Sequence, residues 1–115
     1  LKREEIERRE IKFTTKELKE MAAVNYRENR IIPAYNNLFQ AMTLSPHDKS
    51  IALSLLKVLV QINKNEPLSD SQHEVAVNAA NLLGKTSLPA NQQQKRDEYL
   101  SALSLNEAAV HATPE

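Results

Sequence analysis

Two stripes of apolar and small residues at helical spacing dominate residues 18–46, and they constrain the fold more than any other feature of the chain. Residues three and four positions apart share one face of an α-helix, so each stripe predicts one helix. The first stripe consists of Leu18, Met21, Ala22, Asn25 and Tyr26. The second consists of Ala34, Leu38, Ala41 and Met42, with Tyr35 and Phe39 beside it. Because alanine side chains are short, we expect the two helix axes to approach closely.

Local signals mark where these two helices begin and end. Thr14 followed by Glu17 is a capping-box pattern, in which each side chain accepts a hydrogen bond from a free backbone N–H. Pro33 suits the first turn of a helix, where its missing N–H would be unbonded in any case. Pro46 disfavours a helical conformation at the residue before it. The stretch therefore predicts two helices folded back on each other as a hairpin.

The spacing of these residues resembles the signature of the tetratricopeptide repeat. The matching positions are Leu18-x2-Met21-Ala22-x2-Asn25, then Ala34-x3-Leu38, then Pro46. The chain departs from the signature where leucine replaces tryptophan, alanine replaces glycine and Asn25 replaces tyrosine. The match covers one repeat. The resemblance implies stacked helical hairpins, with the first helix of each pair lining a concave face.

The rest of the chain predicts more helices of the same kind. Residues 50–62 are apolar almost all round, as expected of a helix at the centre of a domain. After a loop, a helix is expected from Ser69 or Ser71, with Ser71 and Glu74 as a second capping box and Gly84 as a left-handed cap. Residues 89–105 predict a last helix that covers the second pair. The fold class expected is therefore all-α, with antiparallel hairpins in a short tetratricopeptide-like array of about five helices plus a leading helix.

Three segments are expected along the chain. Residues 1–13 are rich in Lys, Arg and Glu, and they predict either a solvated connector helix or a short coiled-coil seam. Residues 14–105 form the helical domain, and residues 106–115 form a frayed C-terminal tail. Because the chain begins with Leu1 rather than methionine, we expect it to be a piece of a longer protein.

Composition narrows the classes of partner. The chain has 15 basic and 15 acidic residues, so its formal net charge is zero and gives no general attraction for nucleic acid. No apolar run approaches the ~18 residues that a membrane span needs. The chain contains no cysteine, which fits a reducing compartment such as the cytoplasm. We therefore expect a cytoplasmic protein that binds neither nucleic acid nor membranes.

No residue pattern indicates catalysis, a cofactor or a metal site. His47, His73 and His111 are far apart and have no partner at ligand spacing. The chain lacks a Gly-rich phosphate loop, a nucleophile elbow and a zinc-binding HExxH motif. We predict that the protein is not an enzyme and binds no cofactor.

A partner-binding groove is the remaining candidate site. Lys19 and Arg27 point away from the apolar stripe of the first helix, and Tyr26 lies at the margin of that stripe. Lys57 and Gln61 occupy corresponding positions of the first helix of the next pair, so these five residues would line the groove. These side chains suit an acidic peptide, extended or helical, because lysine and arginine form charge-assisted hydrogen bonds with carboxylates. Some tetratricopeptide proteins hold a peptide carboxylate with lysine and asparagines, but Ala23 occupies one such asparagine position. The alternative is that these are ordinary solvated side chains.

The sequence therefore predicts a noncatalytic protein–protein interaction module of a larger cytoplasmic, bacterial regulatory protein. This predicted module is similar to the C-terminal repeat modules that follow receiver domains in some response regulators of bacterial signal transduction. The alternative is a structural bundle that forms a homodimer and has no peptide groove. Because fewer than three full repeats leave apolar ends uncovered, we also expect the module to self-associate through Leu53, Val58 or the Tyr35/Phe39 face.

Overall fold

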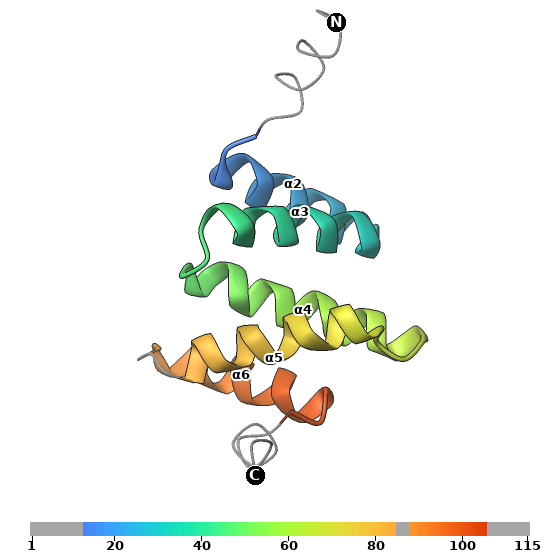
Figure 1. Cartoon of the computed structure of the whole chain (residues 1–115), viewed down its shortest axis with the longest axis vertical. Helices are drawn as coiled ribbons and strands as arrows, with labels where there is room; N and C mark the ends of the chain where they lie inside the picture. Colours follow the sequence, from blue (N-terminus) through green and yellow to red (C-terminus); the bar gives the residue numbers. More distant parts are fainter. Residues whose placement is uncertain (1–12, 85–87, 106–115) are drawn as a thin grey trace, which may run out of the picture.

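The computed structural model describes residues 13–84 and 88–105, and these ranges contain five α-helices and no strand. The helices are α2 (Thr15–Arg27), α3 (Ile31–Leu44), α4 (Lys49–Asn65), α5 (Asp70–Gly84) and α6 (Ala90–Ala102) (Figure 1). The predicted all-α fold is confirmed. The expected leading helix, apart from Phe13, and the expected tail from residue 106 lie outside the described residues.

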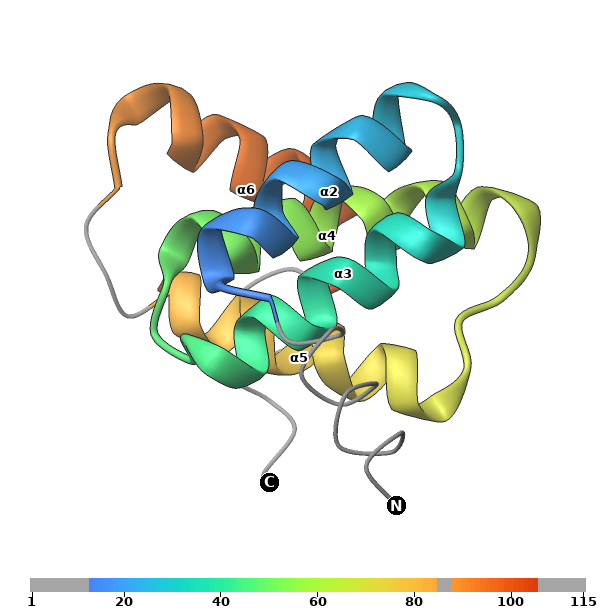
Figure 2. The ribbon, with the colours of Figure 1, turned by 90° about the horizontal axis from the view of Figure 1, so that it is seen from above.

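The helices stack in chain order along the long axis of the molecule (Figure 1). α2 packs on α3, α3 packs on α4, α4 packs on α5, and α6 contacts both α4 and α5. Seen from above, α2, α4 and α6 lie toward one side, and α3 and α5 lie toward the other (Figure 2). The α2–α3 hairpin predicted from the two stripes is therefore present, and α6 covers the α4–α5 pair as expected.

The predicted start of α2 is confirmed, and its end has a motif that the sequence analysis did not identify. The Oγ1 atom of Thr14 accepts from the Glu17 N–H at 3.1 Å, and Oε1 of Glu17 accepts from the Thr14 N–H at 2.9 Å. At the other end Asn29 has a φ of 63°, and the Arg30 N–H donates to the Asn25 carbonyl at 2.7 Å. This is a Schellman motif with asparagine in place of glycine, because asparagine tolerates the left-handed region.

Two predictions about α5 are wrong. Its capping box is made by Ser69 and Gln72: the Gln72 N–H donates to Oγ of Ser69 at 3.1 Å, and the Ser69 N–H donates to Oε1 of Gln72 at 3.0 Å. Ser71 and Glu74 fit the same pattern, but the helix has already begun at Asp70. Gly84 is the last residue of α5 and has no positive φ, so it is not a left-handed cap.

The last helix is shorter than residues 89–105 predicted. α6 ends at Ala102, and Ser104 follows with a φ of 59°. The Leu105 N–H donates to the Leu100 carbonyl, so α6 also ends in a Schellman motif. Leu105 and Leu100 are both buried, and apolar residues at these two positions often accompany this motif.

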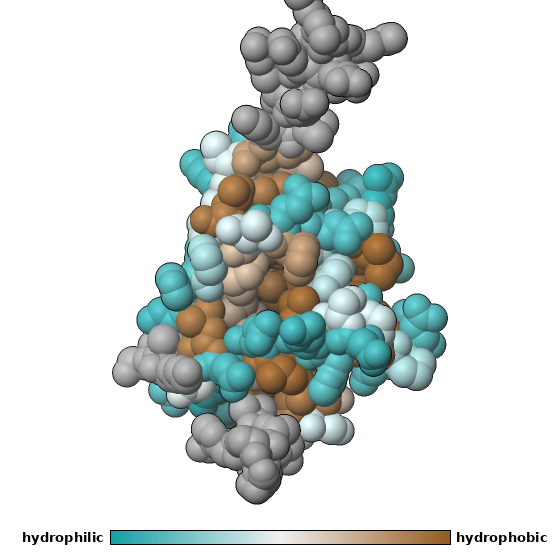
Figure 3. Space-filling view, viewed as in Figure 1, coloured by the Kyte–Doolittle hydropathy of each residue, from teal (hydrophilic) through white to brown (hydrophobic). Residues whose placement is uncertain are grey.

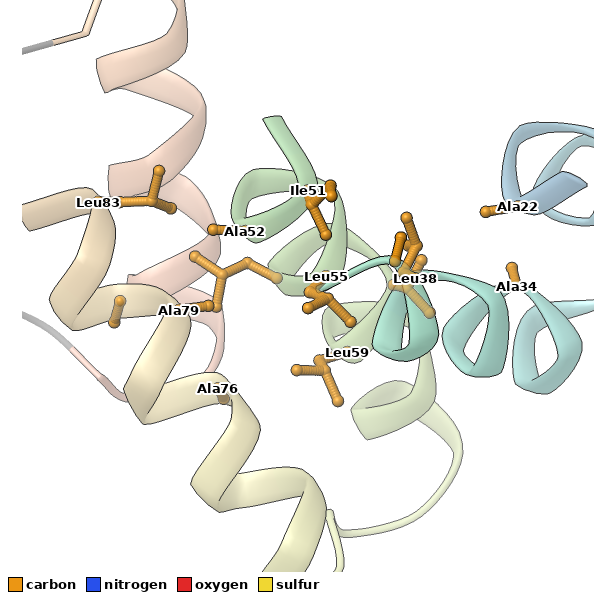
Figure 4. Packing of buried hydrophobic residues seen from close by; sticks show 14 of the residues in the cluster. Ala22, Ala34, Leu38, Ile51, Ala52, Leu55, Leu59, Ala76, Ala79 and Leu83 are labelled. Carbon is orange, nitrogen blue, oxygen red and sulfur yellow. The ribbon is translucent and has the colours of Figure 1, made fainter. Parts of the chain in front are cut away.

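The core is built around α4, as its uniformly apolar sequence predicted. Seven of its residues are buried, more than in any other described helix: Ile51, Ala52, Leu55, Leu56, Val58, Leu59 and Ile62. Leu55 lies between Leu38 of α3 and Ala79 of α5 (Figure 4). Alanines at Ala22, Ala34 and Ala41 are buried as well, which fits the close approach of α2 and α3. The burial of Val58 contradicts the suggestion that this side chain forms an interface.

Candidate functional site

The three helices on one side of the molecule bring together lysine and tyrosine side chains that are distant in the sequence. Lys19 and Tyr26 on α2 are seven residues apart, so they share one side of the helix about 10.5 Å apart along its axis. Lys19 contacts Asp48 just before α4, and Tyr26 contacts Lys57 within it. Because both contacts follow chain order, α2 and α4 run in the same direction.

Tyr26 and Lys57 contact each other on this surface. The Nζ atom of Lys57 lies 4.5 Å from the centre of the Tyr26 ring. At this distance the positive charge is attracted to the negative face of the aromatic ring, a cation–π interaction. Lys57 is exposed, so its ammonium group retains access to solvent and to a binding partner. The contact holds a charged and an aromatic group together.

Lys19 is positioned by the cap of α4. Its Nζ atom lies 3.4 Å from Oδ2 of Asp48, while Oδ1 of Asp48 accepts from the N–H groups of Ser50 at 2.9 Å and Ile51 at 3.3 Å. Partial burial acts to raise the pKa of Asp48, but the hydrogen bonds and the Lys19 charge together outweigh it and leave this pKa below its usual range. Asp48 is therefore an anchor for Lys19 as well as a helix cap.

Tyr99 is half-buried on α6, which shares one side of the molecule with α2 and α4, whereas the sequence pattern predicted it only as an apolar residue of the last helix. Burial raises the pKa of Tyr99, and the electrostatic influence of Tyr26 and Glu98 raises it further. Tyr26 and Tyr99 lie on helices that share one side of the molecule (Figure 2). The signal that could have found Tyr99 is the alternation of the helices, because α2, α4 and α6 lie toward the same side of the molecule (Figure 2).

The five predicted groove residues are not all brought into contact. Tyr26 and Lys57 contact each other, whereas Lys19 bonds to Asp48 instead. Arg27 is exposed and Gln61 is half-buried. Neither forms a side-chain hydrogen bond or ion pair with another residue in the described ranges. We name the group formed by Lys19, Tyr26, Lys57 and Tyr99 the lysine–tyrosine surface.

A shallow depression lies along α2 at this surface. It has a volume of about 470 Å³ and is lined by Thr15, Lys16, Lys19, Glu20 and Ala23. Ala23, where an asparagine would be wanted for a carboxylate clamp, leaves room but offers no hydrogen bond. The depression is open to solvent, so it suits a side chain of a larger partner better than an enclosed small molecule.

The described part of the chain shows no metal-binding cluster and no membrane-spanning helix. Within residues 13–84 and 88–105, no three His, Asp or Glu side chains come close enough to hold a metal ion. His47 and His73 are both exposed, and His111 lies outside the described residues. Among the described helices, none combines the length and the apolar character needed to cross a membrane. No family model, curated protein or solved structure matches the chain.

Proposed function

We propose that the chain is a noncatalytic protein–protein interaction module, and that its lysine–tyrosine surface binds a peptide segment of a partner protein. The observation that carries the proposal is the pairing of the exposed Lys57 ammonium with the Tyr26 ring, 4.5 Å apart, on helices that share one side of the molecule. Tyrosine combined with a cation is common in recognition surfaces, because it offers apolar area and a hydrogen bond at small entropic cost.

The partner that fits this surface is acidic. Lys19 and Lys57 are ammonium groups with three donors each, and Lys19 uses one of them on Asp48. A carboxylate of the partner accepts from the remaining donors, and an apolar or aromatic side chain packs beside Tyr26 and Tyr99. The spacing of Lys19 and Tyr26 along α2, about 10.5 Å, corresponds to three or four residues of extended peptide.

The proposal is tested with labelled peptides of one length and different charge. A glutamate-rich peptide containing one phenylalanine is compared with the same peptide carrying glutamine in place of glutamate, using fluorescence anisotropy at about 50 and 200 mM salt. The acidic peptide should bind more tightly, and its affinity should fall with salt because the Coulomb attraction is screened. Equal binding of both peptides contradicts the acidic partner.

A pair of variants then locates the binding. Lys57→Gln removes one positive charge from the lysine–tyrosine surface, whereas Asn78→Asp makes the same change of net charge on the exposed face of α5, toward the other side of the molecule. The Lys57→Gln variant loses one charge-assisted contact, so it should bind the acidic peptide about tenfold more weakly than the wild type. The Asn78→Asp variant should bind the peptide almost as tightly as the wild type. Equal effects of the two variants would show that only net charge matters.

The wider setting of the module rests on the sequence. The resemblance to tetratricopeptide repeats supports a binding role. Successive helices lie on alternate sides of the molecule, with α2, α4 and α6 on one side and α3 and α5 on the other, and this arrangement is consistent with the resemblance. The absence of cysteine favours the cytoplasm, and the charged residues 1–13 suit a connector within a bacterial regulatory protein.

A further inference from the structure

α3 is a helix without charge in a chain that is otherwise rich in charge. Lys, Arg, Asp and Glu make up 26% of the protein, yet none occurs between Arg30 and Asp48, which is the longest stretch of the chain without them. α3 lies wholly within this stretch. Its exposed residues are Ile32, Pro33, Asn36, Phe39, Gln40, Thr43 and Leu44. The solvent-facing side of α3 is therefore neutral along its whole length.

The same side of α3 carries large apolar groups. Ile32 is 49% exposed and Phe39 is 48% exposed. Tyr35 lies between them in the sequence, and its ring stacks on that of Phe39 with centroids 6.2 Å apart. The spacing of these three residues, three and then four positions, places them in one row along the helix. Apolar side chains interrupt the polar surface over α3 in the view of Figure 3.

The lack of charge decides what kind of surface can cover this row. A partner with charged groups would have to bury them here without an opposite charge, which is strongly unfavourable. A second copy of α3 brings no charge and brings the same apolar row. We propose that two copies of the chain associate through α3, with Ile32, Tyr35 and Phe39 at the centre of the contact.

Two-fold symmetry sets the register of this contact. Identical surfaces meet isologously, so the two α3 helices run antiparallel. A two-fold axis between Tyr35 and Asn36 packs Ile32 against the partner's Phe39, and packs Phe39 against the partner's Ile32. Asn36 then lies beside the partner's Asn36, where the two amides can bond to each other. In this register, every residue of the row has an apolar or uncharged neighbour.

The size of the contact predicts a weak dimer. A helix of 14 residues is about 21 Å long and about 10 Å wide, which gives less than the ~800 Å² per partner of a standard interface. We therefore expect association in the range of tens to hundreds of micromolar, visible as a mass that rises with concentration. The contact is independent of the lysine–tyrosine surface, which lies on the other side of the molecule.

The first test measures mass by sedimentation equilibrium from about 10 µM to 1 mM. Phe39→Lys places a charge in the centre of the contact, and Phe13→Lys makes the same substitution at a phenylalanine that is 40% exposed and lies outside α3. The wild-type chain and Phe13→Lys should approach dimer mass, whereas Phe39→Lys should stay monomeric. A monomeric wild-type chain at 1 mM overturns the proposal, as does a Phe39→Lys variant that dimerises like the wild type.

The second test uses the lack of native cysteine and does not depend on a destabilising variant. Helix axes 8–10 Å apart bring facing Cα atoms within about 6 Å, so Asn36→Cys should form a disulfide with its own copy under mild oxidation. Asn91→Cys is the matched control, because Asn91 is also an exposed asparagine in a helix but lies on α6. Equal crosslinking of both variants overturns the proposed register. Circular dichroism checks that all variants remain helical.

Discussion

Leu55 is the side chain whose removal should damage the fold most clearly. It is fully buried in α4 and lies between Leu38 of α3 and Ala79 of α5, so it joins the two hairpins (Figure 4). The substitution Leu55→Ala removes three carbon atoms from this position and leaves the helix propensity of α4 almost unchanged. Its effect therefore measures packing between hairpins.

The surroundings of Leu55 place the expected loss near the upper end of the known range. A buried leucine truncated to alanine loses about 2 to 5 kcal/mol, and the loss is larger when neighbours cannot move into the cavity. The buried residues of α5 include Ala76, Ala79 and Ala80, and alanine has no rotamers with which to fill a gap. We therefore expect a loss of about 3 to 5 kcal/mol. That is a large fraction of the 5 to 15 kcal/mol typical of a domain.

Urea denaturation followed by circular dichroism at 222 nm measures this change, since the chain has no tryptophan for fluorescence. Leu44→Ala is the control, because Leu44 is 56% exposed at the end of α3 and its truncation should change the free energy of unfolding by less than about 0.5 kcal/mol. A loss below about 1 kcal/mol for Leu55→Ala would refute the central position of α4. So would equal losses for the two variants.

Two further substitutions test local structure. Gly84→Ala should raise the free energy of unfolding by about 0.4 to 1 kcal/mol in the same urea titration, because Gly84 is helical and an added Cβ atom meets nothing within 4 Å. A lower free energy of unfolding would instead indicate the left-handed cap that the sequence predicted. The pKa of Asp48 is lower in the folded than in the unfolded chain. Its stabilisation of the fold is therefore present above about pH 3.9 and disappears as the pH falls through the folded pKa. Asp48→Asn removes this contribution, so the free energy of unfolding of the variant should fall less between about pH 5 and pH 3 than that of the wild type. An unchanged pH profile for Asp48→Asn would contradict this role.

The candidate site was predictable only in part. Helical phase, combined with the resemblance to tetratricopeptide repeats, selected Tyr26 and Lys57 as residues on the same side of the fold. Tyr99 was missed because its membership depends on how α6 docks against α4, which no local pattern states. The bond from Lys19 to Asp48 was missed for the same reason, since the turn before α4 sets it.

The sequence by itself determined the all-helical character of the described residues and the centre of the core. These features follow from local patterns in the sequence. Apolar residues three and four positions apart predict helices, and the Thr14 capping box predicts where α2 begins. The uniformly apolar sequence of α4 predicts that this helix is buried on several sides. The tertiary structure decided which competing local signals were used. Ser69 rather than Ser71 caps α5, and Gly84 stays helical. Two capping patterns stand two residues apart in the sequence, so the local pattern alone could not choose between them. The tertiary structure also decided which apolar residues remain outside, leaving Phe39 exposed and Val58 buried, since only the docking of neighbouring helices determines which side of a helix is covered.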